Sequence, residues 1–208
     1  MNPRVYLAGP DVFFRDAEAW AERRKAICAE HGLAAVSPLD PLAEESADWA
    51  ALPEWQRIAW RNEAHIRSCD AVIANLTPFR GPSADAGTVY EVGFARALRR
   101  VVFGYTNSAA PFTQRTLDYA STHGGAIASP GRIWRDGEGL LIEQFRRFDN
   151  LMIEGGLIGS GGALVVPERE PVDRWGDLRT FEMCVGLAAV FLTSPAGAGE
   201  VEDAKRQG

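Results

Sequence analysis

Four short apolar runs, separated by segments with helical periodicity, constrain the fold of this chain more than any other feature. They lie at residues 5–8, 34–36, 71–74 and 101–105. Strands that alternate with helices pair in parallel through right-handed crossovers, and a parallel sheet covered on both faces needs continuously apolar strands. The pattern therefore predicts an α/β fold: an open, doubly wound (flavodoxin-like), mostly parallel sheet of about five strands with flanking helices.

Helices are expected in the intervals between these runs and near the carboxyl end. A single apolar stripe marks each of the segments 16–31, 53–67, 86–99 and 178–192. On the helix at 86–99, the residues expected to face the core are Ala86, Tyr90, Gly93 or Phe94, and Ala97. Ligands in such folds bind at the carboxyl ends of the strands, so the loops there are the first place to look for a site.

The pattern weakens after the fourth apolar run. Residues 110–139 are interpreted as a long insertion with a helix near its start. Residues 140–148 are predicted to form a further helix, and the glycine-rich run at 155–162 is expected to be flexible.

The composition is that of an ordinary globular protein. The chain has 208 residues and a formal net charge of -6, which disfavours nucleic acid or an anionic membrane as the main partner. We interpret residues 1–193 as one domain and the small, polar residues at 194–208 as a disordered tail. The cysteines and histidines are too scattered to suggest disulfides or a metal site. No signal-peptide or membrane-spanning pattern is found, so we expect a cytoplasmic protein.

The loop after the first apolar run carries unusual residues for a turn. Gly9 would let a ligand approach the backbone closely, because it has no side chain. Phe13 and Phe14 are adjacent aromatic residues that would stack on a flat ring if they faced a ligand. The same residues are equally consistent with an ordinary turn whose aromatic side chains join the core.

A second candidate site lies at the start of the helix at 86–99. Asp85 immediately precedes this helix and is suited to the N-cap position. Glu91 lies in the second turn, among small and apolar neighbours. Gly87 and Gly93 each weaken the helix by about 1 kcal/mol relative to alanine, which suggests close approach of the sheet or of a ligand. Spacing alone leaves open whether Glu91 is functional or a surface carboxylate.

Four ordered segments resemble the nucleoside 2-deoxyribosyltransferase family. Residues 85–95, DAGTVYEVGFA, match the signature D-x-G-T-x-x-E-x-G-x-A of that family. Residues 69–83 resemble the strand and loop before the signature, and residues 6–10 resemble the first strand and turn. Residues 149–152 resemble an N-L-M segment near the carboxyl end. Together the segments span most of residues 4–155, and their joint match is specific.

The resemblance implies a double displacement at the anomeric carbon of a 2′-deoxyribonucleoside. Glu91 would be the nucleophile, Tyr6 would orient Glu91 through a hydrogen bond, and Asp85 would handle the proton on the base. A second base would then attack the deoxyribosyl ester, so that the original configuration is retained. The family reaction needs no metal and no other cofactor, and its partners are 2′-deoxyribonucleosides and free nucleobases.

The resemblance also suggests which residues hold the substrate. Asn62 stands where some members carry an aspartate that contacts the base, and Gly87 leaves room for the sugar. Gly9, Asp11 and Phe13 of the first loop are expected to line the site.

Two further residues indicate an assembly. Asn150 and Met152 resemble residues that reach the site of a neighbouring subunit in the family. The resemblance therefore implies a homo-oligomer with shared active sites.

The proposed chemistry also makes physical sense without the resemblance. The transition state for cleaving an N-glycosidic bond resembles an oxocarbenium ion, which an adjacent carboxylate stabilises and can trap covalently. The leaving base needs a proton, and an acid such as a desolvated aspartate can supply it.

Two other functions stay open. A deoxynucleoside 5′-monophosphate N-glycosidase would need a phosphate cradle after the first strand. Pro10 lacks an N–H donor there and Asp11 repels a phosphate, whereas Arg15 and Arg80 would favour one. A non-catalytic nucleotide-sensing module on the same fold is the third reading, and it would not need a carboxylate such as Glu91.

Overall fold

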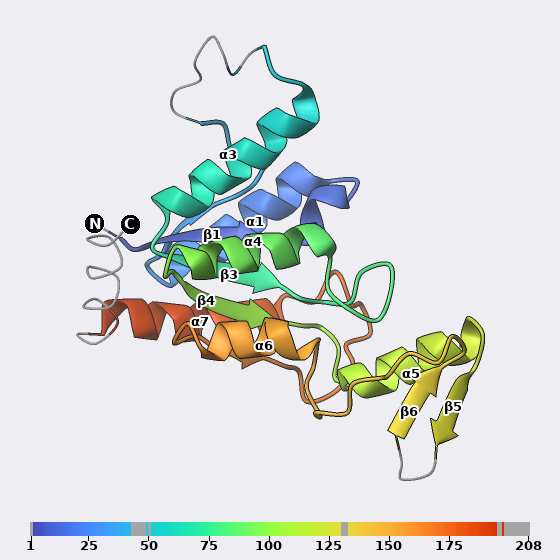
Figure 1. The fold of residues 1–208 in the computed structure, drawn as a ribbon. Helices are drawn as coiled ribbons and strands as arrows, with labels where there is room; N and C mark the ends of the chain where they lie inside the picture. The colour runs from blue at the N-terminus through green and yellow to red at the C-terminus, as the bar shows by residue number, and fades with distance from the viewer. Residues whose placement is uncertain (1, 43–48, 50, 130–132, 195–196, 198–208) are drawn as a thin grey trace.

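The computed structural model contains one five-stranded sheet in which all strands run parallel (Figure 1). It describes residues 2–42, 49, 51–129, 133–194 and 197. The strand order is β2-β1-β3-β4-β7, with bounds β1 Arg4–Ala8, β2 Ala34–Val36, β3 Ala71–Asn75, β4 Val101–Tyr105 and β7 Leu164–Val165. This sheet confirms the predicted α/β fold class. Apart from residues 194 and 197, the expected tail lies outside the described residues.

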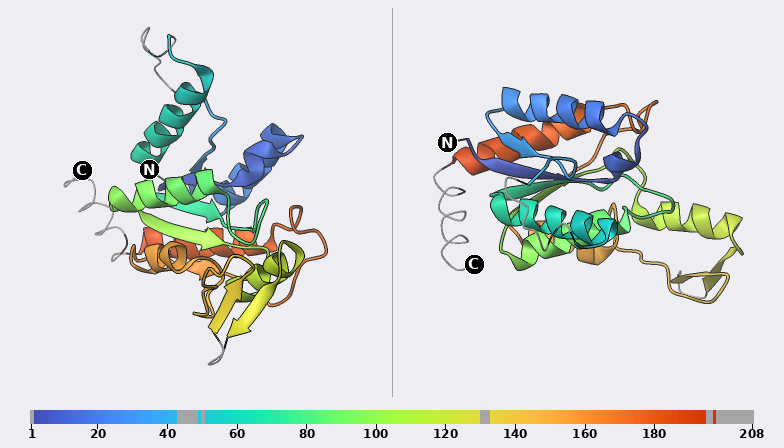
Figure 2. Two further views of the ribbon diagram at one scale, coloured as in Figure 1. Left: turned by 45° about the vertical axis from the view of Figure 1, so that its right-hand side comes forward. Right: turned by 90° about the horizontal axis from the view of Figure 1, so that it is seen from above.

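Helices cover both faces of the sheet, as Figure 2 shows in its right-hand view. One face is covered by α1 (Ala17–Glu30) and α7 (Arg179–Thr193), and the other by α3 (Glu54–Ser68), α4 (Ala86–Ala97) and α6 (Leu151–Ile158). Side chains alternate along a strand, so on β1 Val5 and Leu7 join the first core cluster while Tyr6 and Ala8 join the second. Tyr6 therefore lies on the face that α3 and α4 cover.

The strand order creates a switch point between β1 and β3. The chain leaves β1 through the 3-10 helix η1 (Pro10–Phe13) and α1 toward β2 on one side, whereas β3 leads through α4 toward β4 on the other. In this topology the loops at the carboxyl ends of the two strands diverge, and the crevice between them is where ligands bind. The two loops that the sequence suggested as candidate sites, one after β1 and one before α4, therefore border the same crevice. Within the described ranges, no helix is long and apolar enough to cross a membrane.

The insertion after β4 extends away from the sheet (Figures 1 and 2). It consists of α5 (Phe112–Thr122), which was predicted, and a hairpin of β5 (Ala126–Ser129) and β6 (Ile133–Asp136), which was not. The predicted helix at 140–148 is wrong. The apolar residues that suggested it run beside β6 instead: Leu141 bridges Arg135, and the Ile142 amide donates to the Trp134 carbonyl at 2.9 Å.

The glycine-rich run at 155–162 is more regular than expected. Its first half completes α6, and its second half makes the tight turn into β7. Gly161 has a φ of 86°, and a Cβ on Gly162 would lie 1.9 Å from the Val102 carbonyl oxygen. The glycines therefore serve a close backbone approach between α6 and the sheet.

Helix α4 faces the core with a different stripe from the expected one. Tyr90, expected in the core, is 58% exposed. The buried residues are Thr88, Glu91, Val92 and Ala95. Periodicity alone placed Tyr90 on the core stripe, whereas the helix turns the Glu91 carboxylate toward β1 and α3.

Candidate active site

Glu91 is the centre of the site, and it receives hydrogen bonds from two other elements. The Tyr6 hydroxyl on β1 donates to Glu91 Oε1 at 2.7 Å, and Asn62 Nδ2 on α3 donates to the same oxygen at 3.0 Å. Glu91 is only 8% exposed. Its second oxygen, Oε2, accepts no hydrogen bond from any described residue. One carboxylate oxygen is thus fixed while the other is left for a ligand.

The environment gives Glu91 an unusual acidity. Burial raises the pKa of Glu91 from 4.5 to about 7, although the hydrogen bonds from Tyr6 and Asn62 act in the opposite direction. The charge of Asp85 adds to the rise. Burial, together with the neighbouring Glu91, also raises the pKa of Tyr6 well above its ordinary value, so Tyr6 stays a hydrogen-bond donor. Such a perturbed carboxylate is typical of functional sites.

The side-chain oxygen of Asn62 is available to a ligand. Its Oδ1 is buried and has no hydrogen-bond partner among the described residues. A buried acceptor without a partner is uncommon in folded proteins, and here it lies beside the Glu91 carboxylate. It can accept a hydrogen bond from a ligand in the site.

Asp85 caps the helix that carries Glu91. Its Oδ2 accepts hydrogen bonds from the Thr88 amide at 2.9 Å and the Thr88 hydroxyl at 3.1 Å. Its Oδ1 accepts none from the described residues, so the capping role leaves one oxygen available. Gly87 is exposed beside it, and an added Cβ there would lie 3.1 Å from Asp85 Oδ2.

The loop that leads into α4 is held by hydrogen bonds to Asp149, which is distant in the sequence. Asp149 is buried and accepts hydrogen bonds from the Ser83 hydroxyl, the Ala84 amide at 2.9 Å and the Asn150 amide at 2.8 Å. Arg115 of α5 lies 3.9 Å from its carboxylate. The sequence assigns no role to Asp149 or Arg115, because an isolated charged residue looks like a surface residue until its burial is known.

The first loop is packed tightly against β3. A Cβ on Gly9 would lie 2.4 Å from Asp11 Oδ2 and 2.8 Å from the Asn75 side chain, so only glycine fits here. Phe13 is 57% exposed and stacks on Phe79 of the β3–α4 loop, with ring centroids 5.3 Å apart. Phe13 is therefore not a core aromatic, and its contact with the half-buried Phe79 joins the two loops.

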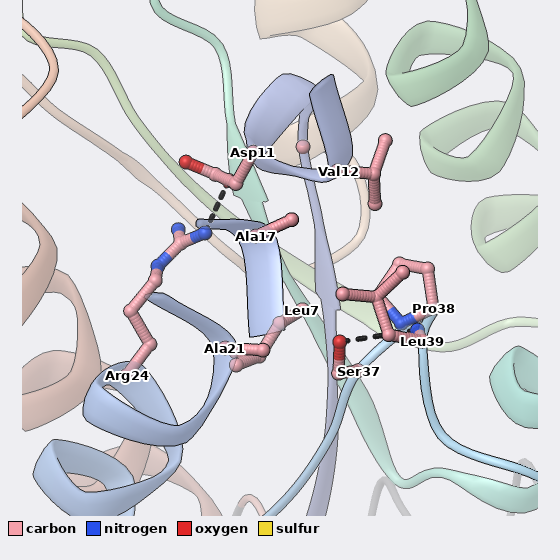
Figure 3. A pocket seen from close by; sticks show the side chains of 10 residues that line it. Leu7, Asp11, Val12, Ala17, Ala21, Arg24, Ser37, Pro38 and Leu39 are labelled. Atoms are coloured by element: carbon pink, nitrogen blue, oxygen red, sulfur yellow. Dashed lines mark hydrogen bonds and ion pairs between the residues drawn. The ribbon is translucent and has the colours of Figure 1, made fainter. Parts of the chain in front are cut away.

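Asp11, expected to contact substrate, is engaged by the protein itself. It forms an ion pair with the buried Arg24 of α1, and Asn75 Nδ2 donates to its Oδ1 at 3.1 Å. Arg24 also donates to the Tyr105 hydroxyl. Figure 3 shows Asp11 and Arg24 at a small cavity of about 20 Å³ behind the loop, which has room for about one water molecule. Sequence analysis missed Arg24, although an arginine between Ala21 and Ile27 on the core stripe of a helix is a usable signal.

Asn150 and Met152 lie apart from Glu91 within one chain. Asn150 caps α6 by accepting from the Met152 amide at 3.0 Å, and Met152 is 74% exposed. Both line an open groove of about 940 Å³ between α4 and α6. The α4 residues of this groove, among them Val89 and Gly93, lie on a different side of the helix from Glu91.

No cluster of three or more potential metal ligands occurs in the part of the chain that the structure describes. The groups that the structure brings together at Glu91 are the Tyr6 hydroxyl and the Asn62 amide, with Asp85 at the start of the same helix.

Comparison with known proteins finds a matching family and several similar chains. The profile of the family described as nucleoside 2-deoxyribosyltransferase matches residues 5–152. A 2-desoxiribosyltransferase from Leishmania mexicana is 30% identical, with 73% of this chain and 85% of that chain covered and a TM-score of 0.52. An uncharacterized protein from Schizosaccharomyces pombe is 30% identical over 173 residues, which cover 79% of this chain and 81% of that protein.

A more distant likeness is to a CMP N-glycosidase from Clostridium botulinum. It is 14% identical, with a TM-score of 0.42 over 80% of this chain and 91% of that chain, and it carries no argument about activity. The match over residues 5–152 includes Tyr6, Asn62, Asp85 and Glu91. The chain belongs to the nucleoside 2-deoxyribosyltransferase family.

Proposed function

We propose that this protein transfers 2-deoxyribose between purine or pyrimidine bases through a covalent ester on Glu91, with retention of configuration. The observation that supports it best is the Glu91 carboxylate, with Oε1 held by Tyr6 and Asn62 and Oε2 without a partner among the described residues. A nucleophile held by one oxygen has the other free to attack.

In the first step, Glu91 Oε2 forms a bond to C1′ of the nucleoside as the C1′–N bond breaks. The bonding electrons leave with the base, and Asp85 supplies a proton to the departing nitrogen. The neighbouring carboxylate stabilises the oxocarbenium character that develops at the sugar. The products of this step are a free base and a deoxyribosyl ester.

In the second step, a nitrogen of another base attacks C1′ of the ester and displaces the Glu91 carboxylate. Its proton returns to Asp85, which restores the starting state of both residues. Two successive inversions at C1′ give overall retention.

The substrate would lie over the first loop and the start of α4. Gly9 and Gly87 leave space for the sugar, Phe13 offers an exposed ring to the base, and Asn62 Oδ1 accepts a hydrogen bond. Asp11 is a substrate-side residue in this proposal, acting through the shape of the loop, since Arg24 and Asn75 occupy its carboxylate. A 2′-hydroxyl would destabilise the developing cation, so ribonucleosides should be much poorer substrates. A role in cytoplasmic nucleoside salvage is part of the same proposal.

We also propose that the active protein is a homo-oligomer. Asn150 and Met152 line the groove between α4 and α6 rather than the Glu91 site, so a second copy would have to bring them there. Glu91→Ala and Asn150→Ala proteins, each inactive, should regain activity when mixed under conditions that exchange subunits. A fully active monomer in sedimentation would contradict the shared site.

The reaction is tested by incubating the protein with thymidine and adenine and separating the products. Deoxyadenosine and thymine are expected, and Glu91→Gln should form neither while still binding thymidine. A 2-fluoro-2-deoxyarabinosyl nucleoside should leave a mass adduct on the peptide that contains Glu91. An adduct elsewhere, or substantial transfer by Glu91→Gln, would refute the assignment.

A hydrolase is the second candidate, and one observation favours it. The ion pair with Arg24 offsets the charge of Asp11, so this loop repels a 5′-phosphate less than the sequence alone suggests. Release of 2-deoxyribose 5-phosphate from deoxynucleoside monophosphates, independent of any added base, would favour this reading. Inertness toward both nucleosides and nucleotides would instead support a non-catalytic module.

A further inference from the structure

The segment between β7 and α7 passes over the carboxyl end of the sheet, beyond the region that the family profile matches. We call residues 166–178 the C-terminal strap. Its first attachment is Glu170, whose Oε1 accepts hydrogen bonds from the Ser108 hydroxyl at 2.7 Å and the Ala109 amide at 3.1 Å. These partners follow β4 directly, so the strap is tied to the edge where ligands bind in this fold.

A second attachment lies four residues further on. Asn107 is buried, and its Nδ2 donates to the carbonyl oxygens of Arg174 and Asp177, each at 2.8 Å. The two carbonyls flank Trp175 on both sides. The backbone that carries this tryptophan is therefore clamped to the end of β4.

The turn around Trp175 is also specified locally. Asp173 Oδ1 accepts hydrogen bonds from the Trp175 amide at 3.1 Å and the Gly176 amide at 2.8 Å. A Cβ on Gly176 would lie 2.0 Å from Asp173 Oδ2, so this tight turn requires glycine at that position. An aspartate and a glycine placed in this way hold the tryptophan in one orientation.

The indole ring bridges the two loops that border the switch-point crevice. It meets Phe14, which follows η1, edge to face at 5.5 Å and 71°, and Phe79 of the β3–α4 loop at 6.3 Å and 81°. Phe79 in turn stacks on the exposed Phe13 at an interplanar angle of 15°. The Arg80 guanidinium lies over both stacked rings, 5.1 Å from Phe13 and 4.6 Å from Phe79. The strap thus supports a continuous set of aromatic side chains that joins the two loops.

We propose that Trp175 is a positioning residue for the base of the nucleoside. It fixes Phe14 and Phe79, and so holds the Phe13–Phe79 pair as a rigid surface for a flat heteroaromatic ring. This inference rests on the proposed function of the site. Edge-to-face aromatic contacts favour this geometry over a loose cluster, and a purine covers more of the surface than a pyrimidine does.

Because Trp175 acts through Phe14 and Phe79 rather than on Glu91, it governs binding of the base and not the attack on the sugar. Its loss should therefore raise KM and leave kcat nearly unchanged. A residue with a merely structural role would lower the amount of folded protein without this split between the two constants.

The test compares Trp175→Ala and Trp175→Phe in the full chain. Trp175→Ala should raise the KM of deoxyadenosine by about tenfold, and that of thymidine by less, with kcat changed by less than about twofold. Trp175→Phe should retain most of the affinity, because a smaller ring can still meet Phe14 and Phe79. Trp134→Ala on β6 of the hairpin is the matched control and should leave both constants unchanged.

Equilibrium binding separates this inference from the proposed function. The Kd of deoxyadenosine is measured by calorimetry in a Glu91→Gln background, where no turnover is needed. Glu170→Gln loosens the strap without removing the indole, and it should also raise the Kd of deoxyadenosine. This variant provides the test if Trp175→Ala does not fold. If wild-type protein binds deoxyadenosine but turns nothing over, the proposed reaction fails while the Kd comparison still decides the role of Trp175. An unchanged Kd in folded variants, a fall in kcat alone, or a wild-type protein that binds no nucleoside would overturn the inference.

Discussion

Replacing Glu91 by glutamine should stabilise the folded protein at neutral and alkaline pH. The carboxylate is 8% exposed, and burial raises its pKa from 4.5 to about 7. Glutamine has nearly the same shape and keeps the oxygen that accepts from Tyr6 and Asn62. It has no charge to bury, so it avoids the desolvation of the ionised carboxylate.

The magnitude follows from the two pKa values. Between pH 4.5 and about 7, the folded protein holds a proton on Glu91 that the unfolded chain has already lost. The free energy of unfolding therefore falls as the pH rises through this window, and it levels off above the pKa of the folded state. At about 1.4 kcal/mol per pH unit, the Glu91 carboxylate lowers the free energy of unfolding by about 3 kcal/mol once it is fully ionised.

Urea unfolding of the wild type and Glu91→Gln from about pH 5 to about pH 8 checks this reasoning. The difference in free energy of unfolding should grow with pH in favour of the variant. Glu182→Gln on the exposed side of α7 is the control, because this substitution relieves no burial of a carboxylate. A difference between wild type and Glu91→Gln that stays constant across the range would refute the buried, perturbed carboxylate.

Three further changes probe the site and its support. Tyr6→Phe removes a hydrogen-bond donor that lowers the pKa of Glu91. The value of kcat should therefore fall by roughly 10²-fold, and the acid limb of the pH profile of kcat/KM should move to higher pH. An acid limb at the wild-type pH would argue against this hydrogen bond. Gly9→Ala should destabilise the fold by about 1–3 kcal/mol through overpacking, whereas Gly93→Ala, where a Cβ meets nothing within 4 Å, should stabilise it by up to about 1 kcal/mol in the same denaturation assay. Asp149→Asn presents a side-chain amide to the backbone N–H donors of Ala84 and Asn150, and it should lower the free energy of unfolding by about 1–3 kcal/mol. A variant as stable as the wild type would contradict the role of Asp149 in holding the loop before α4.

The fold class could be predicted because four of the five strands are continuously apolar runs bounded by turns. The fifth strand, β7, has only two residues, Leu164–Val165, and its pairing depends on a glycine turn that passes close to β4. The β5–β6 hairpin escaped prediction because its strands are four residues long and pair only with each other. At residues 140–148 the apolar residues have the spacing of a helical turn, but they follow strand β6 without forming a helix. A short apolar run does not distinguish a helical segment from a non-helical one.

The site was predicted less completely than the fold. Asp85 and Glu91 stood out through the family signature and Tyr6 through the resembling first strand, and Tyr6, Asn62 and Glu91 do lie together. Periodicity alone pointed the wrong way, because it placed Tyr90 rather than Glu91 toward the core.

The residues that support the loops were not identified from the sequence. Arg24, Asp149 and Trp175 each contact partners 13 or more positions away, and arginine and aspartate are common on protein surfaces. Arg24 at least lies on the core stripe of its helix, whereas for Asp149 and Trp175 only burial and contact partners, which come from the tertiary structure, indicate a role.

The two donors to Glu91 converge on one oxygen, and this arrangement resolves a conflict within the proposed reaction. Burial alone would keep the carboxyl protonated and unreactive at neutral pH, whereas hydrogen bonds to both oxygens would ionise it but block the attacking lone pairs. Placing Tyr6 and Asn62 on Oε1 holds the pKa near 7 and leaves Oε2 open. If a variant moved the Asn62 donor to Oε2, the pKa of Glu91 would stay near 7 while the rate of transfer would fall. A fall in the rate of transfer without a change in the pKa of Glu91 would identify Oε2 as the attacking atom.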